Sequence, residues 1–182
     1  MKATRYEYMK VIEDYLKTSD YPNQDLLEIS GNTLECHQFF QNITTVHYPE
    51  VDAHNLPHKD ESFDCVILNQ VLEHVKRPWI VIDEVYRVLR EGGIAILSSP
   101  FFYQVHDHPG DYWRFTPEGL LCLTENSGFK ETLMTNRSGN SEMIRHMIDH
   151  PEDRKSERFL TLAKRNADKS KYFTISTVAV RK

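Results

Sequence analysis

The sequence has few cysteines, and they are too widely spaced for a disulfide framework or a cysteine zinc site. Its three cysteines are Cys36, Cys65 and Cys122, and no two of them form a CxxC pair. An odd number of distant thiols is typical of reduced cysteines inside the cell. The sequence also lacks an apolar stretch close to the roughly 20 residues of a transmembrane helix. Its first residues, MKATRYEYMK, lack the apolar centre of a signal peptide. We therefore expect a cytoplasmic protein that does not bind membranes.

The charge balance offers no broad cationic surface. Asp and Glu number 27 against 22 Lys and Arg, which gives a net charge of −5 at pH 7. Sequence-independent binding to nucleic acid depends on many cationic contacts to phosphates, so we do not expect a nucleic-acid partner. The chain has 182 residues, of which 40% are apolar or aromatic, and contains no internal repeat. This predicts one domain over residues 1–182 with a substantial core.

One complete strand, helix and strand unit lies between Phe63 and Pro100. The nearly continuous apolar run around 66–68 is typical of a parallel strand that is covered on both faces. A helix is predicted to begin at Pro78 and to end at Gly92 and Gly93, and 94–97 is the next strand. A unit of this length is almost always a right-handed parallel crossover. The predicted fold class is therefore α/β.

Further elements are predicted on both sides of this unit. They are an amphipathic helix over 4–17, strands over 25–29, 43–48 and 129–135, a helix that starts at Thr116-Pro117, and a strand over 172–180. The last strand alternates apolar and polar residues, which predicts an antiparallel edge strand exposed on one side. Residues 136–170 are highly charged and are predicted to form an insertion or flap, with a helix over 141–149. The sheet should be mostly parallel, with about six or seven strands.

Polar residues cluster where the predicted strands end. The segments are 28–32, 47–52, 69–74 and 98–114. In an open α/β sheet the ligand crevice lies beyond the carboxyl ends of the strands. The four segments therefore predict one shared binding site.

An ordered set of motifs in these segments resembles a known family. The chain reads LLEISGNT, then VDAHNLPHKDESFDCVILNQVLEHV, then VYRVLREGGIAILSSP. This order is similar to that of the class I S-adenosylmethionine-dependent methyltransferases (methyltransferase type 11) that act on small molecules and glycans. HDHPGDYWRFTPEGL resembles the loop and helix that often follow in this group. The resemblance covers 26–130 and implies a Rossmann-like fold, S-adenosylmethionine as cofactor, and a small-molecule or sugar-like acceptor.

The resemblance also implies which residues contact the cofactor. Glu28 matches the acidic residue that helps to place the methionine part, and Gly31 would let the backbone approach it. Asp52 and Ala53 match the acidic and small pair beside the adenine. The full set of expected cofactor contacts is Glu28, Ser30, Gly31, Asn32, His47, Asp52, Ala53, Asn69, Gln70 and His74.

The sequence departs from the family pattern in two places. Ser30, Asn32 and Leu34 occupy the positions of the usual GxGxG glycines. The family also has an acidic residue for the ribose hydroxyls at the end of its second strand, where this chain has His47 and, further on, Glu50. These departures leave a second interpretation open, in which a catalytically silent methyltransferase fold serves as a binding protein.

The histidine-rich segment 106–115 supplies candidate catalytic residues. Methyl transfer to oxygen or nitrogen requires an aligned nucleophile that loses its proton, and a histidine suits this proton transfer near neutral pH. His106 and His108 are therefore the predicted bases. Asp111, Tyr112 and Arg114 are predicted to bind the acceptor, since a guanidinium pairs bidentately with carboxylate or phosphate.

Two other interpretations of this segment remain open. In the first, its aromatic side chains pack against the core while Arg114 forms an internal ion pair with Asp111. In the second, His106, His108 and Asp111 bind zinc, iron or manganese, as in a metal hydrolase or oxygenase. The sequence has no HExxH pattern. The main prediction is therefore a methyltransferase that needs no metal.

Overall fold

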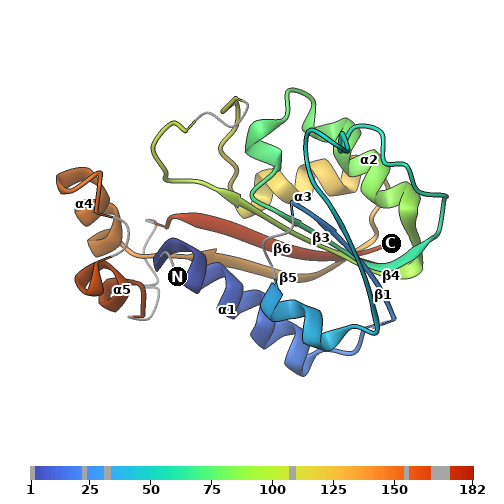
Figure 1. Ribbon diagram of the computed structural model, residues 1–182, viewed down its shortest axis with the longest axis horizontal. Helices are drawn as coiled ribbons and strands as arrows, with labels where there is room; N and C mark the ends of the chain where they lie inside the picture. Colours follow the sequence, from blue (N-terminus) through green and yellow to red (C-terminus); the bar gives the residue numbers. More distant parts are fainter. Residues whose placement is uncertain (1–2, 22–23, 31–33, 107–109, 154–155, 165–172) are drawn as a thin grey trace.

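A six-stranded sheet forms the centre of the computed structural model, which describes residues 3–21, 24–30, 34–106, 110–153, 156–164 and 173–182 (Figure 1). The strands are β1 (Asp25–Ile29), β2 (Asn42–Val46), β3 (Phe63–Asn69), β4 (Leu89–Pro100), β5 (Glu131–Ser138) and β6 (Ile175–Arg181). Their order is β2-β1-β3-β4-β6-β5. The pairs β2–β1, β1–β3 and β3–β4 are parallel, whereas β6 runs antiparallel to both β4 and β5. The predicted α/β class with a mostly parallel sheet is confirmed.

Helices cover both faces of the sheet. They are α1 (Ala3–Thr18), α2 (Pro78–Val88), α3 (Pro117–Asn126), α4 (Ser141–Asp149) and α5 (Glu157–Lys164), with the 3₁₀ helices η1 (Leu34–Phe39) and η2 (Leu72–His74). Helices α2 and α3 lie on one face, and α1 and η1 lie on the other (Figure 1). Strand β3 contributes Val66 and Leu68 to the first core and Cys65 and Ile67 to the second. This burial on both faces explains its continuous apolar sequence. In the described part of the chain, no helix has the length and apolar content to cross a membrane.

The central unit forms as predicted, except at its glycines. Helix α2 ends at Val88, and β4 begins directly at Leu89, so Gly92 and Gly93 lie within the strand. The prediction that they end the helix was wrong. A Cβ atom at Gly93 would lie 2.9 Å from the carbonyl oxygen of Arg90 and 3.0 Å from that of Asp64. Glycine is required at position 93 because the neighbouring backbone leaves no room for a side chain.

The terminal strand β6 is antiparallel, as predicted, but it is not at the edge. It lies between β4 and β5, and its residues from Ile175 to Val180 are buried. The polar positions of its alternating pattern are hydroxyl side chains inside the protein. Ser176, for example, donates a hydrogen bond to the carbonyl oxygen of Phe115 (2.6 Å). The alternation therefore reflects buried hydroxyls rather than a solvent-exposed face.

The charged segment after β5 contains α4 and α5, which lie together at one end of the sheet (Figure 1). The predicted helix over 141–149 is confirmed, and the side chain of Asn140 caps it by accepting the N–H of Met143 (2.9 Å). Met143, Phe159 and Ala163 form a small core between the two helices. The segment is thus a helical pair with its own apolar contacts, and its role as a flap stays a prediction.

Arg87 ties the loop between β2 and β3 to helix α2. Its guanidinium donates hydrogen bonds to the carboxylates of Glu84 and Asp60 and to the carbonyl oxygens of Leu56 and His58, at 2.7–3.1 Å. Glu84 in turn accepts the N–H of Leu56 (2.8 Å). Both the backbone and the charges of this loop are therefore held by one planar side chain.

Replacing Arg87 by lysine keeps the charge but removes the fork of donors. We expect Arg87→Lys to lower the free energy of unfolding by about 2–3 kcal/mol, because hydrogen bonds to charged groups and buried carbonyls are lost. Urea denaturation measures this change. Lys130→Met is the control, since the ion pair of Lys130 with Glu91 is exposed and should matter by less than about 1 kcal/mol. Equal effects of the two substitutions would contradict the anchoring role of Arg87.

Candidate functional site

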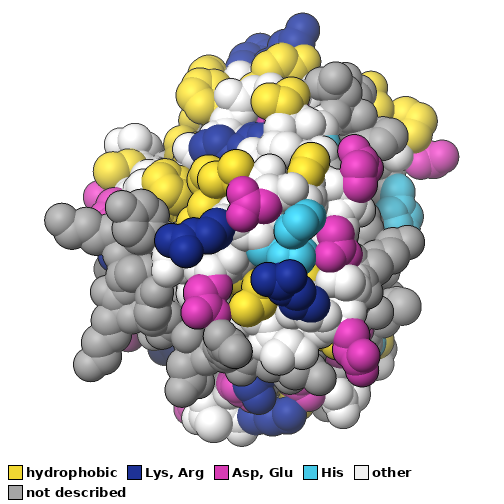
Figure 2. All heavy atoms as spheres, turned by 90° about the vertical axis from the view of Figure 1, so that its left-hand side faces the viewer, with side chains coloured by type: hydrophobic (Ala, Val, Ile, Leu, Met, Phe, Trp, Pro, Cys, Tyr) yellow, Lys and Arg dark blue, Asp and Glu magenta, His cyan; other side chains and the backbone are white. Residues whose placement is uncertain are grey.

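A cavity of about 420 Å³ opens at the carboxyl ends of the first three strands. Its lining comes from the end of β1 at 29–30, the loop 47–54 after β2, the segment 70–77 after β3, and Tyr112. Its volume lies within the roughly 300–1,000 Å³ that is usual for small-molecule sites. Figure 2 views the molecule from the side of Figure 1 on which α4 and α5 lie, where acidic, basic and histidine side chains are interspersed. The cavity occupies the crevice that strand order predicts for an open α/β sheet.

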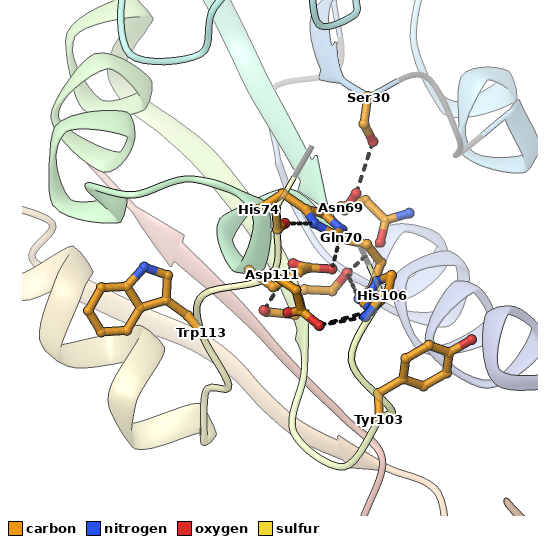
Figure 3. A network of polar contacts seen from close by, with 12 residues as sticks. Ser30, Asn69, Gln70, His74, Tyr103, His106, Asp111 and Trp113 are labelled. Carbon is orange, nitrogen blue, oxygen red and sulfur yellow. Dashed lines mark hydrogen bonds and ion pairs between the residues drawn. The ribbon is translucent and has the colours of Figure 1, made fainter. Parts of the chain in front are cut away.

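Two residues turn the chain sharply at the edge of the cavity. Ser30 and Gln70 have φ angles of +90° and +55°, which residues other than glycine rarely adopt. The hydroxyl of Ser30 donates to the carbonyl oxygen of Asn69 (2.9 Å), and the N–H of Gln70 donates to that of Ser98 (2.9 Å). Figure 3 shows the first of these contacts. The bonds join the ends of β1, β3 and β4 and hold both strained residues in place.

Most of the predicted cofactor residues that the structure describes line this cavity. They are Ser30, His47, Asp52, Ala53, Gln70 and His74. Glu28 and Asn69 are buried outside the lining. The carboxylate of Glu28 lies 2.8 Å from Nε2 of His37, and Oδ1 of Asn69 accepts the hydroxyl of Ser98 (2.5 Å). Gly31, Asn32 and His108 lie outside the described residues. The structure therefore brings six of the expected contacts together, and gives Glu28 and Asn69 partners within the protein.

Asp52 fixes the loop that forms one wall of the cavity. Its carboxylate accepts the backbone N–H of His54 (2.9 Å) and lies 2.7 Å from Nδ1 of the same residue. The hydrogen bond from the His54 backbone lowers the pKa of Asp52. Asp52 is therefore ionised at neutral pH, with the small Ala53 beside it at the wall.

The loop after β4 is held by an internal ion pair. Both terminal nitrogens of Arg114 donate to the carboxylate of Asp111, with Nη2 2.7 Å from Oδ2. Arg114 also reaches the carbonyl oxygens of Tyr103 and Gln104, at 3.3 and 3.2 Å. The guanidinium lowers the pKa of Asp111, whose side chain is only 1% exposed. The structure thus contains the internal ion pair of Asp111 and Arg114, and their role as an acceptor clamp stays a prediction.

Tyr112 faces the cavity while its neighbours fasten the loop. The backbone N–H of Tyr112 donates to the carbonyl oxygen of Glu73 (2.7 Å), and Nε1 of Trp113 donates to that of Val75 (2.9 Å). The side chain of Tyr112 is 48% exposed and lines the cavity. Of the three residues predicted to bind the acceptor, Tyr112 is therefore the one whose side chain lines the cavity.

Glu73, His74 and His106 form a cluster beside the cavity. The rings of His74 and His106 pack edge to face, with centroids 4.8 Å apart (Figure 3). Burial raises the pKa of Glu73 to about 7 and lowers the pKa of His106. His74 lines the cavity, whereas His106 lies behind it, so the role of His106 as a base stays a prediction. The sequence interpretation missed Glu73, although a carboxylate within the apolar run of VLEHV was a usable signal.

This fold and cavity define an α/β protein with a cavity of small-molecule size at the carboxyl ends of its strands. The methyltransferase domain family matches residues 23–97. An uncharacterized methyltransferase of Mycolicibacterium vanbaalenii is 49% identical over 43 residues, which are 24% of this chain and 17% of that protein. The rice 2-methyl-6-phytyl-1,4-hydroquinone methyltransferase 2 is 30% identical over 120 residues, covering 64% of this chain and 34% of that protein. The chain thus spans a third or less of the length of these curated relatives.

A solved structure extends the similarity to nearly the whole fold. Phosphoethanolamine N-methyltransferase 2 of Haemonchus contortus has a TM-score of 0.62 at 14% identity, over 96% of this chain and 52% of that one. At this identity the likeness concerns the fold alone. The match of residues 23–97 to the methyltransferase domain family and the similarity to methyltransferase sequences confirm the predicted resemblance to the S-adenosylmethionine-dependent methyltransferases.

Asp111→Asn tests the structural role of the internal ion pair. We expect the free energy of unfolding to fall by about 2–3 kcal/mol, because the largely buried Arg114 loses its counter-charge. Amide hydrogen exchange of 100–115 should also become faster. Urea denaturation and exchange mass spectrometry measure the two effects.

Glu118→Gln is the matched control for this substitution. It removes a carboxylate that also pairs with an arginine, Arg137, but both side chains are largely exposed. We expect little change in its unfolding curve. If Asp111→Asn were equally silent, the acceptor clamp would again be the better account of Asp111 and Arg114.

Proposed function

We propose that this chain binds S-adenosylmethionine in the cavity and transfers its methyl group to a small-molecule acceptor. The observation that carries this proposal is the cavity itself, which collects six of the expected cofactor residues at the carboxyl ends of β1, β2 and β3. The family supplies the identity of the cofactor, and the described lining fits it. The sulfonium of that cofactor carries an electrophilic methyl group.

The wall around Asp52 suits the nucleoside part of the cofactor. Its ionised carboxylate can accept hydrogen bonds from amino or hydroxyl groups. Ala53 leaves room for a flat base, and Ile29 and Val51 add apolar surface to the lining. A mostly apolar cavity with a few fixed polar groups is the usual form of a cofactor site.

The acceptor would lie next to Tyr112. The ammonium of Lys76 is 6.0 Å from the centre of the Tyr112 ring, and both side chains line the cavity. This pairing suits a small polar or sugar-like acceptor that stacks on the ring and bonds to the cation. The Haemonchus contortus enzyme, a structural neighbour, is a phosphoethanolamine methyltransferase. Alignment of the acceptor atom with the transferred methyl group would supply most of the rate increase.

A catalytically silent binding protein is the second candidate. The observation that favours it is the strained backbone of Ser30, which stands where the family has glycine. A side chain at this turn restricts how closely a ligand approaches the backbone. Such a protein would still hold the cofactor or its demethylated product, but no acceptor would be methylated.

Calorimetry with S-adenosylmethionine and S-adenosylhomocysteine tests the proposal. We expect micromolar binding of both ligands, followed by methylation of at least one compound in an acceptor screen. Asp52→Asn keeps an oxygen acceptor for the His54 N–H but removes the charge, so it should weaken binding by about tenfold.

His150→Ala is the control, because His150 lies at the end of α4, outside the cavity lining. This variant should bind both ligands like the wild type. Binding without methylation of any acceptor would favour the silent protein. Absence of binding to both ligands would contradict both candidates.

A further inference from the structure

Three potential metal ligands meet beside the cofactor cavity. Glu73 and His74 end the short helix η2, and His106 comes from the loop after β4. Each offers one ligand atom, and the three atoms lie within 4.8 Å of one another. The parallel pairing of β3 with β4 brings the two segments together. The cluster therefore depends on the sheet and not on one flexible loop.

Glu73 presents a buried oxygen that lacks a hydrogen bond. Its side chain is 0% exposed, and Oε2 accepts the hydroxyl of Ser99 (3.2 Å). Among the described residues, Oε1 has no hydrogen-bond partner. Nε2 of His74 is 3.7 Å away, which is too long for a hydrogen bond. A buried oxygen without a hydrogen bond lowers the stability of the fold, unless a ligand binds to it.

Both histidines use the same ring nitrogen within the protein. Nδ1 of His74 lies 2.6 Å from the carbonyl oxygen of Gly110, and Nδ1 of His106 lies 3.2 Å from that of Gln104. A carbonyl only accepts hydrogen bonds, so Nδ1 carries the proton in each ring. Nε2 is then left with a free lone pair. Histidines that bind metals typically donate their other ring N–H to an oxygen in this way.

Asp111 adds a carboxylate behind His106. Its Oδ2 lies 3.3 Å from Nδ1 of His106 and also accepts the backbone N–H of that residue (2.9 Å). Arg114 holds this carboxylate from the other side. The ion pair thus orients a ring, as in the carboxylate–histidine–metal arrangement of zinc proteins.

We propose that Glu73, His74 and His106 bind one divalent transition-metal ion, with Zn²⁺ or Mn²⁺ as the fitting chemistry. Two imidazoles and one carboxylate suit these ions and leave coordination positions open. Because His74 lines the cavity, an ion bound by this cluster would lie next to the cavity. This set shares His106 with the ligand set considered from sequence alone, in which Asp111 was a ligand; in the structure Asp111 pairs with Arg114.

The ion would bind an oxygen of the acceptor and lower its pKa. That role rests on the proposed methyl transfer, whereas the ion site itself does not. An acceptor hydroxyl bound to the metal would lose its proton to water before its oxygen takes the methyl group, so His106 would not need to act as a free base. The site therefore departs from the metal-free enzyme that the sequence predicts.

Metal titration of the full chain tests the site directly. The protein is dialysed against EDTA and titrated with Zn²⁺, Mn²⁺ or Mg²⁺ alone, by calorimetry and, for Mn²⁺, by electron paramagnetic resonance. We expect one Zn²⁺ or Mn²⁺ per chain and weaker binding of Mg²⁺. Glu73→Gln and His106→Ala should each weaken Zn²⁺ binding by at least about tenfold.

His150→Ala removes a histidine outside the cluster and should leave the affinity unchanged. Circular dichroism and thermal melting of each variant without metal separate loss of a ligand from loss of the fold. Unchanged Zn²⁺ affinity in folded Glu73→Gln and His106→Ala would overturn the proposal, as would preferential binding of Mg²⁺.

Calorimetry with S-adenosylhomocysteine on the same samples keeps the two proposals separate. Cofactor binding by a chain that takes up no metal would overturn the ion site and leave the proposed function standing. Metal binding by a chain that takes up no cofactor would overturn the proposed function and leave the ion site standing.

Discussion

The parallel pairing of β3 with its two neighbours is the constraint on which the site depends. Pairing with β1 and β4 brings three strand ends to one edge of the sheet, so residues about 30–40 positions apart become neighbours. The hydrogen bonds of Ser30 to Asn69 and of Gln70 to Ser98 then fix the spacing of these ends. Burial of β3 on both faces makes the arrangement rigid, because any shift would disturb both cores. The cavity walls follow directly from these strand ends and are therefore held in place.

Two carboxylates in and beside the cavity are held by partners within the protein. Asp111 is neutralised by Arg114, and Asp52 is held by the backbone of its own loop. Glu73 differs, since burial raises its pKa and only one of its oxygens is hydrogen-bonded within the described chain. A carboxylate that is costly to bury and lies beside two oriented imidazoles is better explained by a ligand than by stability.

Local patterns in the sequence predicted the helices and strands well. An element whose buried face is well defined has a clear period of apolar residues along the chain. The unit from β3 to β4 is the best example. The position of β6 was not predictable in the same way, since buried hydroxyls such as Ser176 look like exposed positions in a strand.

The crevice followed from strand order alone. Glu73 was missed because its partner His106 is 33 positions away in sequence. The ion pair of Arg114 with Asp111, only three positions away, is the alternative that the sequence analysis had left open beside the acceptor clamp.

The two ends of the sheet contrast in a way that argues for function. At the amino ends of the strands, Arg90 bridges Asp25 and Asp64 at 2.8 Å, so three neighbouring strands are joined by complementary charges. At the carboxyl ends, Ser30 and Gln70 have strained backbones and an oxygen of Glu73 lacks a hydrogen bond among the described residues. Stability alone would favour paired charges of this kind at both ends. The strain persists beside the cavity because the surrounding core is strong enough to hold side chains in positions that suit a ligand better than they suit the fold.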